Sequence, residues 1–181
     1  MPIPTVLVIF PAGFEEIEAV TPVDLLRRAG ALVTLASLAE GMHVTGRNGM
    51  TLHTDGALSA FESGSFDCIV LPGGPGVKLL SDDERVAGLL RRQLASDGWI
   101  AAICAAPLAL DAAGILKGRR FTAHASVAAD LPGALLDEKV VVDGRIITSR
   151  GAGTALDFGL MIIEKLISRD KAAEVAKSIC T

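Results

Sequence analysis

The sequence predicts an α/β protein with a mainly parallel central sheet and helices on both of its faces. Apolar runs rich in β-branched residues alternate along the chain with stretches of helical periodicity. The apolar runs show no polar alternation, which is typical of parallel strands that are covered on both sides. The 181 residues are enough for one hydrophobic core, so residues 1–181 are expected to form a single domain.

The first β-α-β unit is expected near the N-terminus. Residues 5–10 read as an apolar, β-branched strand, and residues 32–36 read as the next one. Between them, apolar side chains recur at helical spacing over residues 15–28, and Gly30 ends this helix.

The middle of the chain repeats this order after a small insertion. The Asn-Gly pair at 48–49 lies between short alternating segments and predicts a hairpin. Residues 66–71 read as another buried strand, which leads into the glycine-rich loop 72–76. Asp82 or Asp83 can cap the helix that follows. That helix is expected to end near residue 95. Strand 99–103 and a helix from residue 105 follow it. The C-terminal part is expected to contain a hairpin of 140–142 and 145–148, a helix from 151–154 to about 167, and a last helix after 170.

Composition and charge exclude several classes of function. A net charge of −4 with no basic run gives no support for direct nucleic-acid binding. The longest apolar stretch, 99–116, is interrupted by Pro107, Asp111 and Gly114, so no transmembrane helix is predicted. Residues 1–10 lack the features of a signal peptide, and a cytoplasmic protein is expected.

The spacing of potential ligands predicts neither a metal nor a cofactor. The three cysteines are far apart and form no disulfide framework and no CxxC pair. Loop 72–76 lacks both the ending of a P-loop and the spacing of a dinucleotide fingerprint. Cys68, in the middle of an apolar strand, is expected to fill the core, and Cys180 is expected to be an ordinary thiol near the C-terminus.

Cys104 is the residue with the most informative surroundings. It follows the apolar strand 99–103 and precedes a helical segment, so it is expected on a sharp strand-to-helix turn. The N–H groups and the dipole of a helix start favour an anion, and this geometry is expected to lower the pKa of the thiol. The sequence therefore predicts a nucleophile elbow with a reactive cysteine.

Two further loops are expected at the same edge of the sheet, because the carboxyl ends of parallel strands lie together. One carries Glu15, Glu16 and Glu18 at a helix start, where acidic residues often serve only the helix dipole. The other carries Gly73 and Gly74, which either form a simple turn or offer backbone N–H groups to an anion.

The three histidines are less informative. His43 and His53 flank the predicted hairpin and are expected at the surface or at an interface. His124 follows a short segment after the elbow helix and could return to the same edge as Cys104. From the residues alone, His124 is equally compatible with a hydrogen-bonding core residue and with a proton shuttle.

Six motifs together resemble the ThiJ/PfpI superfamily, and within it the branch of the Parkinsonism-associated protein deglycase and the bacterial chaperone YajL. The motifs are GFEEIE at 13–18, PVD at 22–24, RRAG at 27–30, VLPGG at 70–74, AAICAAP at 101–107 and TSRGAGT at 148–154. The resemblance implies a flavodoxin-like sandwich, similar to class I glutamine amidotransferases, and a homodimer with its pocket near the interface. It implies no cofactor.

The resemblance also implies roles for individual residues. Cys104 would be the nucleophile, Glu18 the carboxyl group that contacts its sulfur, and His124 a nearby imidazole. Three residues would supply N–H groups around an oxyanion, namely Gly73, Gly74 and Ala105. Two residues, Asp24 and Arg28, match positions that support the pocket.

Some positions depart from the family pattern. Ala125 and Ala152 replace prolines that line the site, and His53 stands where some relatives have a second redox-active cysteine at the dimer interface. Arg47 lies one position before the arginine of relatives, which puts an anion contact from Arg47 at an interface in doubt. Substrate preference could differ accordingly.

Three functions are compatible with this pattern. The first is a cysteine-dependent, cofactor-free deglycase or glyoxalase that acts on methylglyoxal or early glycation adducts of protein groups, with a stress-protective role. The second is an oxidative-stress sensor and chaperone for unfolded proteins, in which Cys104 is oxidised. A PfpI-like peptidase is disfavoured, because alanine replaces the histidine that follows the cysteine in that branch.

Overall fold

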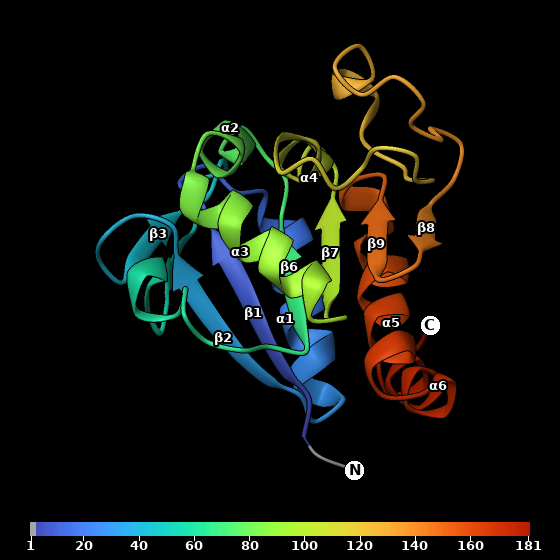
Figure 1. Cartoon of the computed structure of the whole chain (residues 1–181). Coiled ribbons are helices and arrows are strands. Elements are labelled where there is room, and N and C mark those ends of the chain that lie inside the picture. The colour runs from blue at the N-terminus through green and yellow to red at the C-terminus, as the bar shows by residue number, and fades with distance from the viewer. Residues whose placement is uncertain (1–2) are drawn as a thin grey trace.

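The computed structural model describes residues 3–181 and contains a seven-stranded sheet in the order β5-β2-β1-β6-β7-β9-β8 (Figure 1). The strands are β1 (Thr5–Phe10), β2 (Leu32–Ser37), β5 (Gly56–Ala57), β6 (Cys68–Leu71), β7 (Trp99–Ile103), β8 (Val140–Asp143) and β9 (Ile146–Ser149). All neighbouring strands are parallel except the hairpin β8–β9. The mainly parallel sheet predicted from the sequence is confirmed.

Helices cover both faces of this sheet, as predicted. They are α1 (Glu16–Arg28), α2 (Val77–Ser81), α3 (Glu84–Ala95), α4 (Pro107–Ala112), α5 (Ala155–Leu166) and α6 (Arg169–Ser178). The helices form two groups, one on each face of the sheet, and strand β1 contributes side chains to both faces. Leu7 and Ile9 belong to the hydrophobic core with α2, α3 and α4, whereas Val6 and Val8 belong to the second core with α1, α5 and α6. Nearly all residues of the central strands β1, β6 and β7 are buried, which is why these strand sequences show no polar alternation.

A separate two-stranded sheet follows β2. Its strands β3 (His43–Thr45) and β4 (Thr51–His53) pair in antiparallel register, with His43 opposite His53. The Asn-Gly turn between them confirms the predicted hairpin. The turn is attached to α1, because the Glu16 carboxylate accepts hydrogen bonds from the backbone N–H of Asn48 at 2.8 Å and from its side-chain amide at 2.9 Å.

Several element boundaries differ from the prediction. Strand β6 begins at Cys68, two residues later than predicted, and the carboxylate of the preceding Asp67 accepts from the backbone N–H of Thr5 at 2.7 Å. Helix α2 was not expected, since the glycine-rich loop before it suggested only a turn. The final helix begins at Arg169, with Ser168 as its N-cap accepting from the N–H of Lys171 at 3.1 Å.

The helix after Cys104 also starts later than predicted. Its first residue is Pro107, because Cys104 to Ala106 form a turn in which the N–H of Ala106 donates to Ile103 O at 3.0 Å. Three short 3₁₀ helices complete the fold, namely η1 (Leu58–Ala60), η2 (Ala125–Val127) and η3 (Ala152–Thr154). The last two lie next to the loop that carries Cys104.

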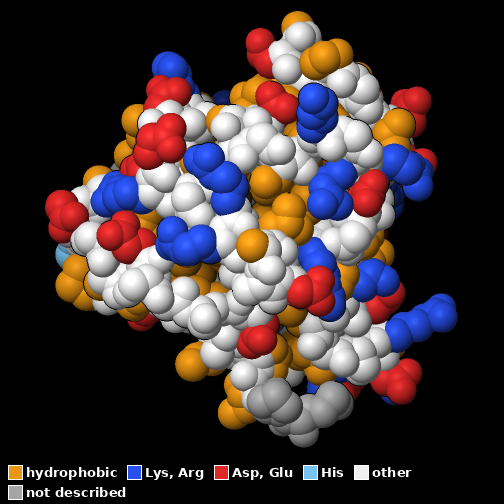
Figure 2. Space-filling view, in the orientation of Figure 1, with side chains coloured by type: hydrophobic (Ala, Val, Ile, Leu, Met, Phe, Trp, Pro, Cys, Tyr) orange, Lys and Arg blue, Asp and Glu red, His pale blue; other side chains and the backbone are white. Residues whose placement is uncertain are grey.

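The surface carries charges of both signs. On the face shown in Figure 2, lysine and arginine side chains are intermixed with aspartate and glutamate side chains. Among residues 3–181, no helix is both long and apolar enough to cross a membrane.

Candidate active site

Cys104 occupies a strained turn at the carboxyl end of β7. Its φ angle is 65°, in the left-handed region that L-residues rarely adopt, at a typical cost of about 1–3 kcal/mol. The turn is held by neighbours, since the N–H of Cys104 donates to Ser149 O at 2.8 Å and its carbonyl accepts from the N–H of His124 at 2.8 Å. The side chain is half-buried at the floor of a cavity. The sharp strand-to-helix turn expected from the sequence is therefore present.

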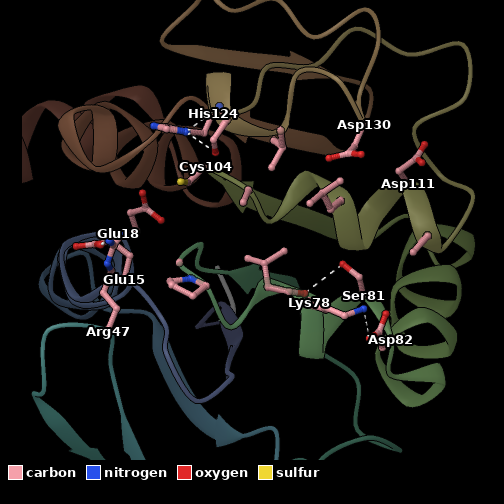
Figure 3. A pocket seen from close by; sticks show the side chains of 18 of the residues that line it. Glu15, Glu18, Arg47, Lys78, Ser81, Asp82, Cys104, Asp111, His124 and Asp130 are labelled. Carbon is pink, nitrogen blue, oxygen red and sulfur yellow. Dashed lines mark hydrogen bonds and ion pairs between the residues drawn. The ribbon is translucent and has the colours of Figure 1, made fainter.

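Glu18 lies directly beside this thiol. Its side chain points from the buried stripe of α1, where Glu18, Pro22 and Leu25 follow one another at helical spacing, and it is only 1% exposed. The carboxyl group is hydrogen-bonded to the Cys104 side chain and accepts from the backbone N–H of Gly73 at 3.0 Å and from that of Ala152. Figure 3 shows Glu18 and His124 on opposite sides of the Cys104 sulfur.

The pair of acidic groups is strongly coupled. Burial raises the pKa of Glu18 to about 7, and the nearby charge of Glu15 acts in the same direction. Burial and the adjacent Glu18 carboxylate raise the pKa of Cys104 to about 12, although the N–H groups of Ala105 and Gly74 oppose this shift. This differs from the expectation that the turn would lower the thiol pKa, because the prediction from the turn did not include burial beside a carboxylate.

Between the two titrations, one proton serves both groups. Two interacting sites lose their protons in steps that belong to the pair, so above pH 7 the pair keeps one proton, for which the Glu18 oxygen and the Cys104 sulfur compete. When Glu18 holds that proton, the sulfur is a thiolate that accepts a hydrogen bond from the acid. The site can therefore supply a nucleophile without a fully free thiolate.

Gly73 has a different role from the predicted one. Its N–H is taken by Glu18, so it is not free for an oxyanion, and only the N–H groups of Gly74 and Ala105 are directed to the sulfur. A Cβ atom at Gly73 would lie 2.6 Å from the Cβ of Cys104 and 3.0 Å from Ile103 O. Glycine is needed here because the loop, the Glu18 carboxyl group and the Cys104 side chain approach one another closely.

His124 reaches the same cavity from the N-terminal side of η2. Its ring Nδ1 accepts from the backbone N–H of Ser126 at 3.1 Å and lies 2.8 Å from the Ser126 hydroxyl. With Nδ1 occupied as an acceptor, the neutral ring carries its proton on Nε2. The side chain is exposed and lines the cavity with Cys104.

The cavity has a volume of about 750 Å³ and extends well beyond the sulfur. At one end, Arg47 pairs with Glu15 at 3.4 Å between Nη1 and Oε2, so this arginine contacts an acid of its own chain. The far wall carries charged side chains that sequence reasoning did not single out, namely Lys78, Asp82, Asp111 and Asp130 (Figure 3). None of these four residues lies within one of the six motifs, and no local pattern places them at the cavity.

Asp24 and Arg28 lie outside the cavity within one chain. They form an exposed ion pair on the outer face of α1, 2.7 Å between Arg28 Nε and Asp24 Oδ2, and neither lines the cavity. Within one chain the helix turns both residues to solvent while it buries Glu18, so their expected support of the pocket stays a prediction. Ala152 lines the cavity and its N–H binds Glu18, whereas Ala125 is exposed.

The other cysteines are placed as expected. Cys68 is fully buried in β6 and burial raises the pKa of its thiol, whereas Cys180 is exposed. Over residues 3–181, histidine, cysteine and acidic side chains form no group of three or more with metal-binding geometry. The Cys104 thiol, the Glu18 carboxyl group and two backbone N–H donors thus form the chemical centre of the site.

Known proteins share this arrangement of the chain. The family model described as DJ-1/PfpI family matches residues 4–165. Protein dj-1beta of Drosophila melanogaster is 42% identical over 177 residues, which cover 96% of this chain and 95% of that protein. The crystal structure of Drosophila melanogaster DJ-1beta superposes with a TM-score of 0.96 at 40% identity, over 99% of both chains.

Two further relatives add information, one through the activity in its name and the other through its greater length. Glutathione-independent glyoxalase DJR-1.2 of Caenorhabditis elegans is 37% identical over 94% of this chain and 92% of its own. Protein DJ-1 homolog B of Arabidopsis thaliana is 38% identical over 97% of this chain, which spans only 41% of that protein's length. The family match over most of the chain, together with relatives at about 40% identity, means that this chain belongs to the DJ-1/PfpI family.

Proposed function

We propose that the protein is a cysteine-dependent, cofactor-free glyoxalase that converts methylglyoxal to lactate and also acts on early methylglyoxal adducts of amines and thiols. The observation that carries this proposal is the position of the Cys104 thiol between the Glu18 carboxyl group and the N–H groups of Gly74 and Ala105. The relative named as a glutathione-independent glyoxalase supports the same class of reaction.

The first step is addition of the thiol to the aldehyde. The shared proton is on Glu18 while the sulfur forms a bond to the aldehyde carbon and the carbonyl π electrons move to oxygen. Glu18 then gives this proton to the oxygen, which completes the hemithioacetal and leaves a Glu18 carboxylate that can act as a base. The N–H groups of Gly74 and Ala105, which point to the sulfur, are placed to donate to that oxyanion. A donor of this kind typically contributes about 10²–10³-fold to the rate.

The second step is an internal redox reaction that needs no external oxidant. A proton leaves the former aldehyde carbon of the hemithioacetal, and its electron pair reduces the neighbouring ketone through an enediol. Protonation at that neighbouring carbon gives a lactate thioester on Cys104, and water then hydrolyses the thioester and restores the thiol. Glu18 is the base closest to the sulfur, and His124, with its exposed Nε2–H, is placed to exchange protons with the cavity.

The test is lactate formation from methylglyoxal without glutathione. Cys104→Ala is expected to lower the turnover by at least about a thousandfold, the typical loss when a nucleophile is removed. Cys180→Ala is the matched control, because Cys180 is the exposed thiol outside the cavity. Full activity of Cys104→Ala would refute the proposal. The adduct activity is tested separately, by lactate release from preformed adducts after free methylglyoxal has been removed.

The same site also favours a second function, oxidation of Cys104 as a stress signal. A sulfinate at this position would accept hydrogen bonds from protonated Glu18 and from the N–H groups of Gly74 and Ala105, which is the pattern that stabilises a buried oxyanion. Mass spectrometry after mild peroxide is expected to find Cys104 oxidised before Cys68 and Cys180. Prior oxidation of Cys180 would contradict the sensor function and leave the glyoxalase proposal intact.

We also propose that the protein forms a homodimer through the outer face of α1. Ile17 and Val20 on this helix are 54% and 40% exposed, and Met50 on the adjoining hairpin is 57% exposed. Met50 lies beside α1, because its N–H donates to Glu16 at 3.4 Å. Large apolar side chains gathered on one surface are typical of an interaction site.

A further inference from the structure

The cavity of Cys104 has an acidic end that the reaction with methylglyoxal itself does not use. Asp111 in α4 and Asp130 after η2 line this end, and both side chains are exposed. Figure 3 shows them on the opposite side of the cavity from Glu15 and Arg47. The acidic end therefore lies away from α1 and the hairpin β3–β4, which carry the proposed dimer surface.

Asp111 and Asp130 keep their negative charges unbalanced. Among residues 3–181, neither forms an ion pair. Lys78 on the neighbouring wall is bound to Asp82 at 2.8 Å, so its charge is already compensated. Lys117 lines a second cavity of about 360 Å³ that shares both aspartates, and it pairs with neither of them. The end of the cavity is therefore suited to a cation from outside the chain.

An apolar passage joins the Cys104 sulfur to this end. Leu108, Asp111 and Ala112 line the cavity at the spacing of one face of α4, and Val127 lines it from η2. From the first residue of α4 to Asp111 the helix rises about 6 Å. Methylglyoxal, with three carbons, is too short to span this passage. A larger substrate with its carbonyl carbon at the sulfur would place its more distant groups at the two carboxylates.

The backbone that carries Asp130 is held in place. Its N–H donates to Val127 O at 3.1 Å, and the N–H of Leu131 donates to the same oxygen at 3.0 Å. Val127 and Leu131 are both buried in the core under α4. Asp111 is held by α4 itself, so binding of a cation orders two short side chains and no backbone.

We propose that Asp111 and Asp130 select substrates that carry a positive charge beyond the reacting carbonyl. This inference rests on the proposed function, and for that function it names the preferred adducts: those on peptide segments with lysine or arginine close to the modified residue. A cation relieves the repulsion between the two carboxylates, whereas an acidic segment adds to it. Each carboxylate is expected to favour a cation over a neutral group by about threefold, as is typical of a solvent-exposed ion pair.

The charge preference is tested first with two methanethiosulfonate reagents, one with a trimethylammonium-ethyl group and one with a sulfonato-ethyl group. The parent chain carries Cys180→Ser, and Cys68 is fully buried, so the reagents report on Cys104. In each reaction the sulfur takes up the thioalkyl group and methanesulfinate leaves. The ratio of the cation rate to the anion rate is expected to fall about tenfold in Asp111→Asn and about tenfold in Asp130→Asn, because each change weakens attraction and repulsion alike.

Asp170→Asn is the matched control, because it removes one exposed negative charge from α6, outside the cavity. This control is expected to keep the ratio of the parent chain. Use of a ratio cancels any change in the thiol pKa, and thermal unfolding checks that each variant is folded. In 1 M salt the ratio of the parent is expected to approach that of the Asp111→Asn and Asp130→Asn double variant, because the Debye length falls to about 3 Å.

Selection of adducts is tested with methylglyoxal hemithioacetals of two blocked peptides, in which the cysteine is flanked by two lysines or by two glutamates. Lactate release is corrected for release from free methylglyoxal. The parent is expected to show a KM about tenfold lower for the lysine peptide, and the double variant is expected to lose this preference. An unchanged reagent ratio and unchanged KM values in the double variant of an active chain would refute only the present inference. The expected fall of the reagent ratio in a chain that forms no lactate would instead refute the proposed function, and with it the assignment to adducts.

Discussion

The carboxyl group of Glu18 and the thiol of Cys104 are hydrogen-bonded to each other, although they come from α1 and from the end of β7. Each group alone would be an unremarkable buried acid. Between about pH 7 and about pH 12 the two groups together hold one proton. In this range the pair carries a single negative charge, and the reactivity of the sulfur depends on which of the two groups holds the proton.

The first prediction concerns the reactivity of Cys104 with iodoacetamide. In wild type, the alkylation rate is expected to rise with an apparent pKa near 7, because loss of the first proton from the pair creates a fraction of thiolate. In Glu18→Gln this step is expected to disappear, and the thiol pKa is expected to fall below about 12, because the charge of Glu18 is gone.

The measurement uses Cys180→Ser as the parent chain, so that only Cys104 reacts, since Cys68 is fully buried. A wild-type rate that rises only in strongly alkaline solution would show that the proton remains on sulfur. Identical profiles for wild type and Glu18→Gln would remove Glu18 from the activation of the thiol.

The second prediction links Glu18 to folding stability. Its pKa is raised from 4.5 to about 7 in the folded chain, so the folded state binds the extra proton between these values. The stabilisation is fully present below pH 4.5 and is lost as the pH rises through 7. The free energy of unfolding of wild type relative to Glu18→Gln is therefore expected to fall by up to about 3 kcal/mol between pH 4.5 and 8.

Urea unfolding at several pH values measures this difference. Glu16→Gln provides a neighbouring control of opposite sign, because hydrogen bonds from Asn48 and Met50 lower the pKa of Glu16 although burial opposes them. The contribution of Glu16 is present above its unfolded pKa and is lost as the pH falls. A stability difference for Glu18→Gln that does not depend on pH would contradict the raised pKa.

The sequence predicts the fold better than the site. The strands and helices follow from local patterns, whereas the contacts of the site join residues that are far apart in the chain. Strand β1 and the turn at Cys104 are visible from local patterns, namely an apolar β-branched run and a run that changes into a helix. Glu18 is an acid at an apolar position of the α1 stripe, which is a usable signal, but its contact with Cys104 depends on how β1 and β7 are placed. The resemblance to a family, and not periodicity, identified that contact.

Other details of the site cannot be read from local sequence at all. In the sequence, the N–H of Gly73 could donate to an oxyanion or to a carboxylate. In the folded chain it donates to Glu18, because α1 places this carboxyl group next to the Gly73 loop. Asp24 and Arg28 have the spacing of an ion pair on one helix face, and that spacing does not tell whether the face meets the cavity or solvent.

The third prediction concerns Gly73. Gly73→Ala is expected to destabilise the fold and to remove most activity, because the new Cβ would meet the Cβ of Cys104 at 2.6 Å and displace the Glu18 contact. Gly88→Ala is the matched control, since Gly88 lies within α3 and a Cβ there meets only the Arg92 side chain at 3.5 Å. This control is expected to gain about 0.5–1 kcal/mol of stability from helix propensity. Thermal unfolding and lactate formation are measured for both, and a fully active Gly73→Ala would show that the loop can move away from Cys104.

The last prediction tests the proposed dimer surface. Ile17→Asp is expected to convert the protein to a monomer in light scattering, because a charge would have to be desolvated between two apolar surfaces. Leu32→Asp is the matched control, since Leu32 is 62% exposed at the start of β2, outside α1 and its hairpin. This control is expected to keep the dimer. A monomeric wild type would reject the dimer itself, whereas a dimer that survives Ile17→Asp and dissociates with Leu32→Asp would place the interface at the other surface. Activity of a monomeric Ile17→Asp then tells whether the cavity of Cys104 is complete within one chain.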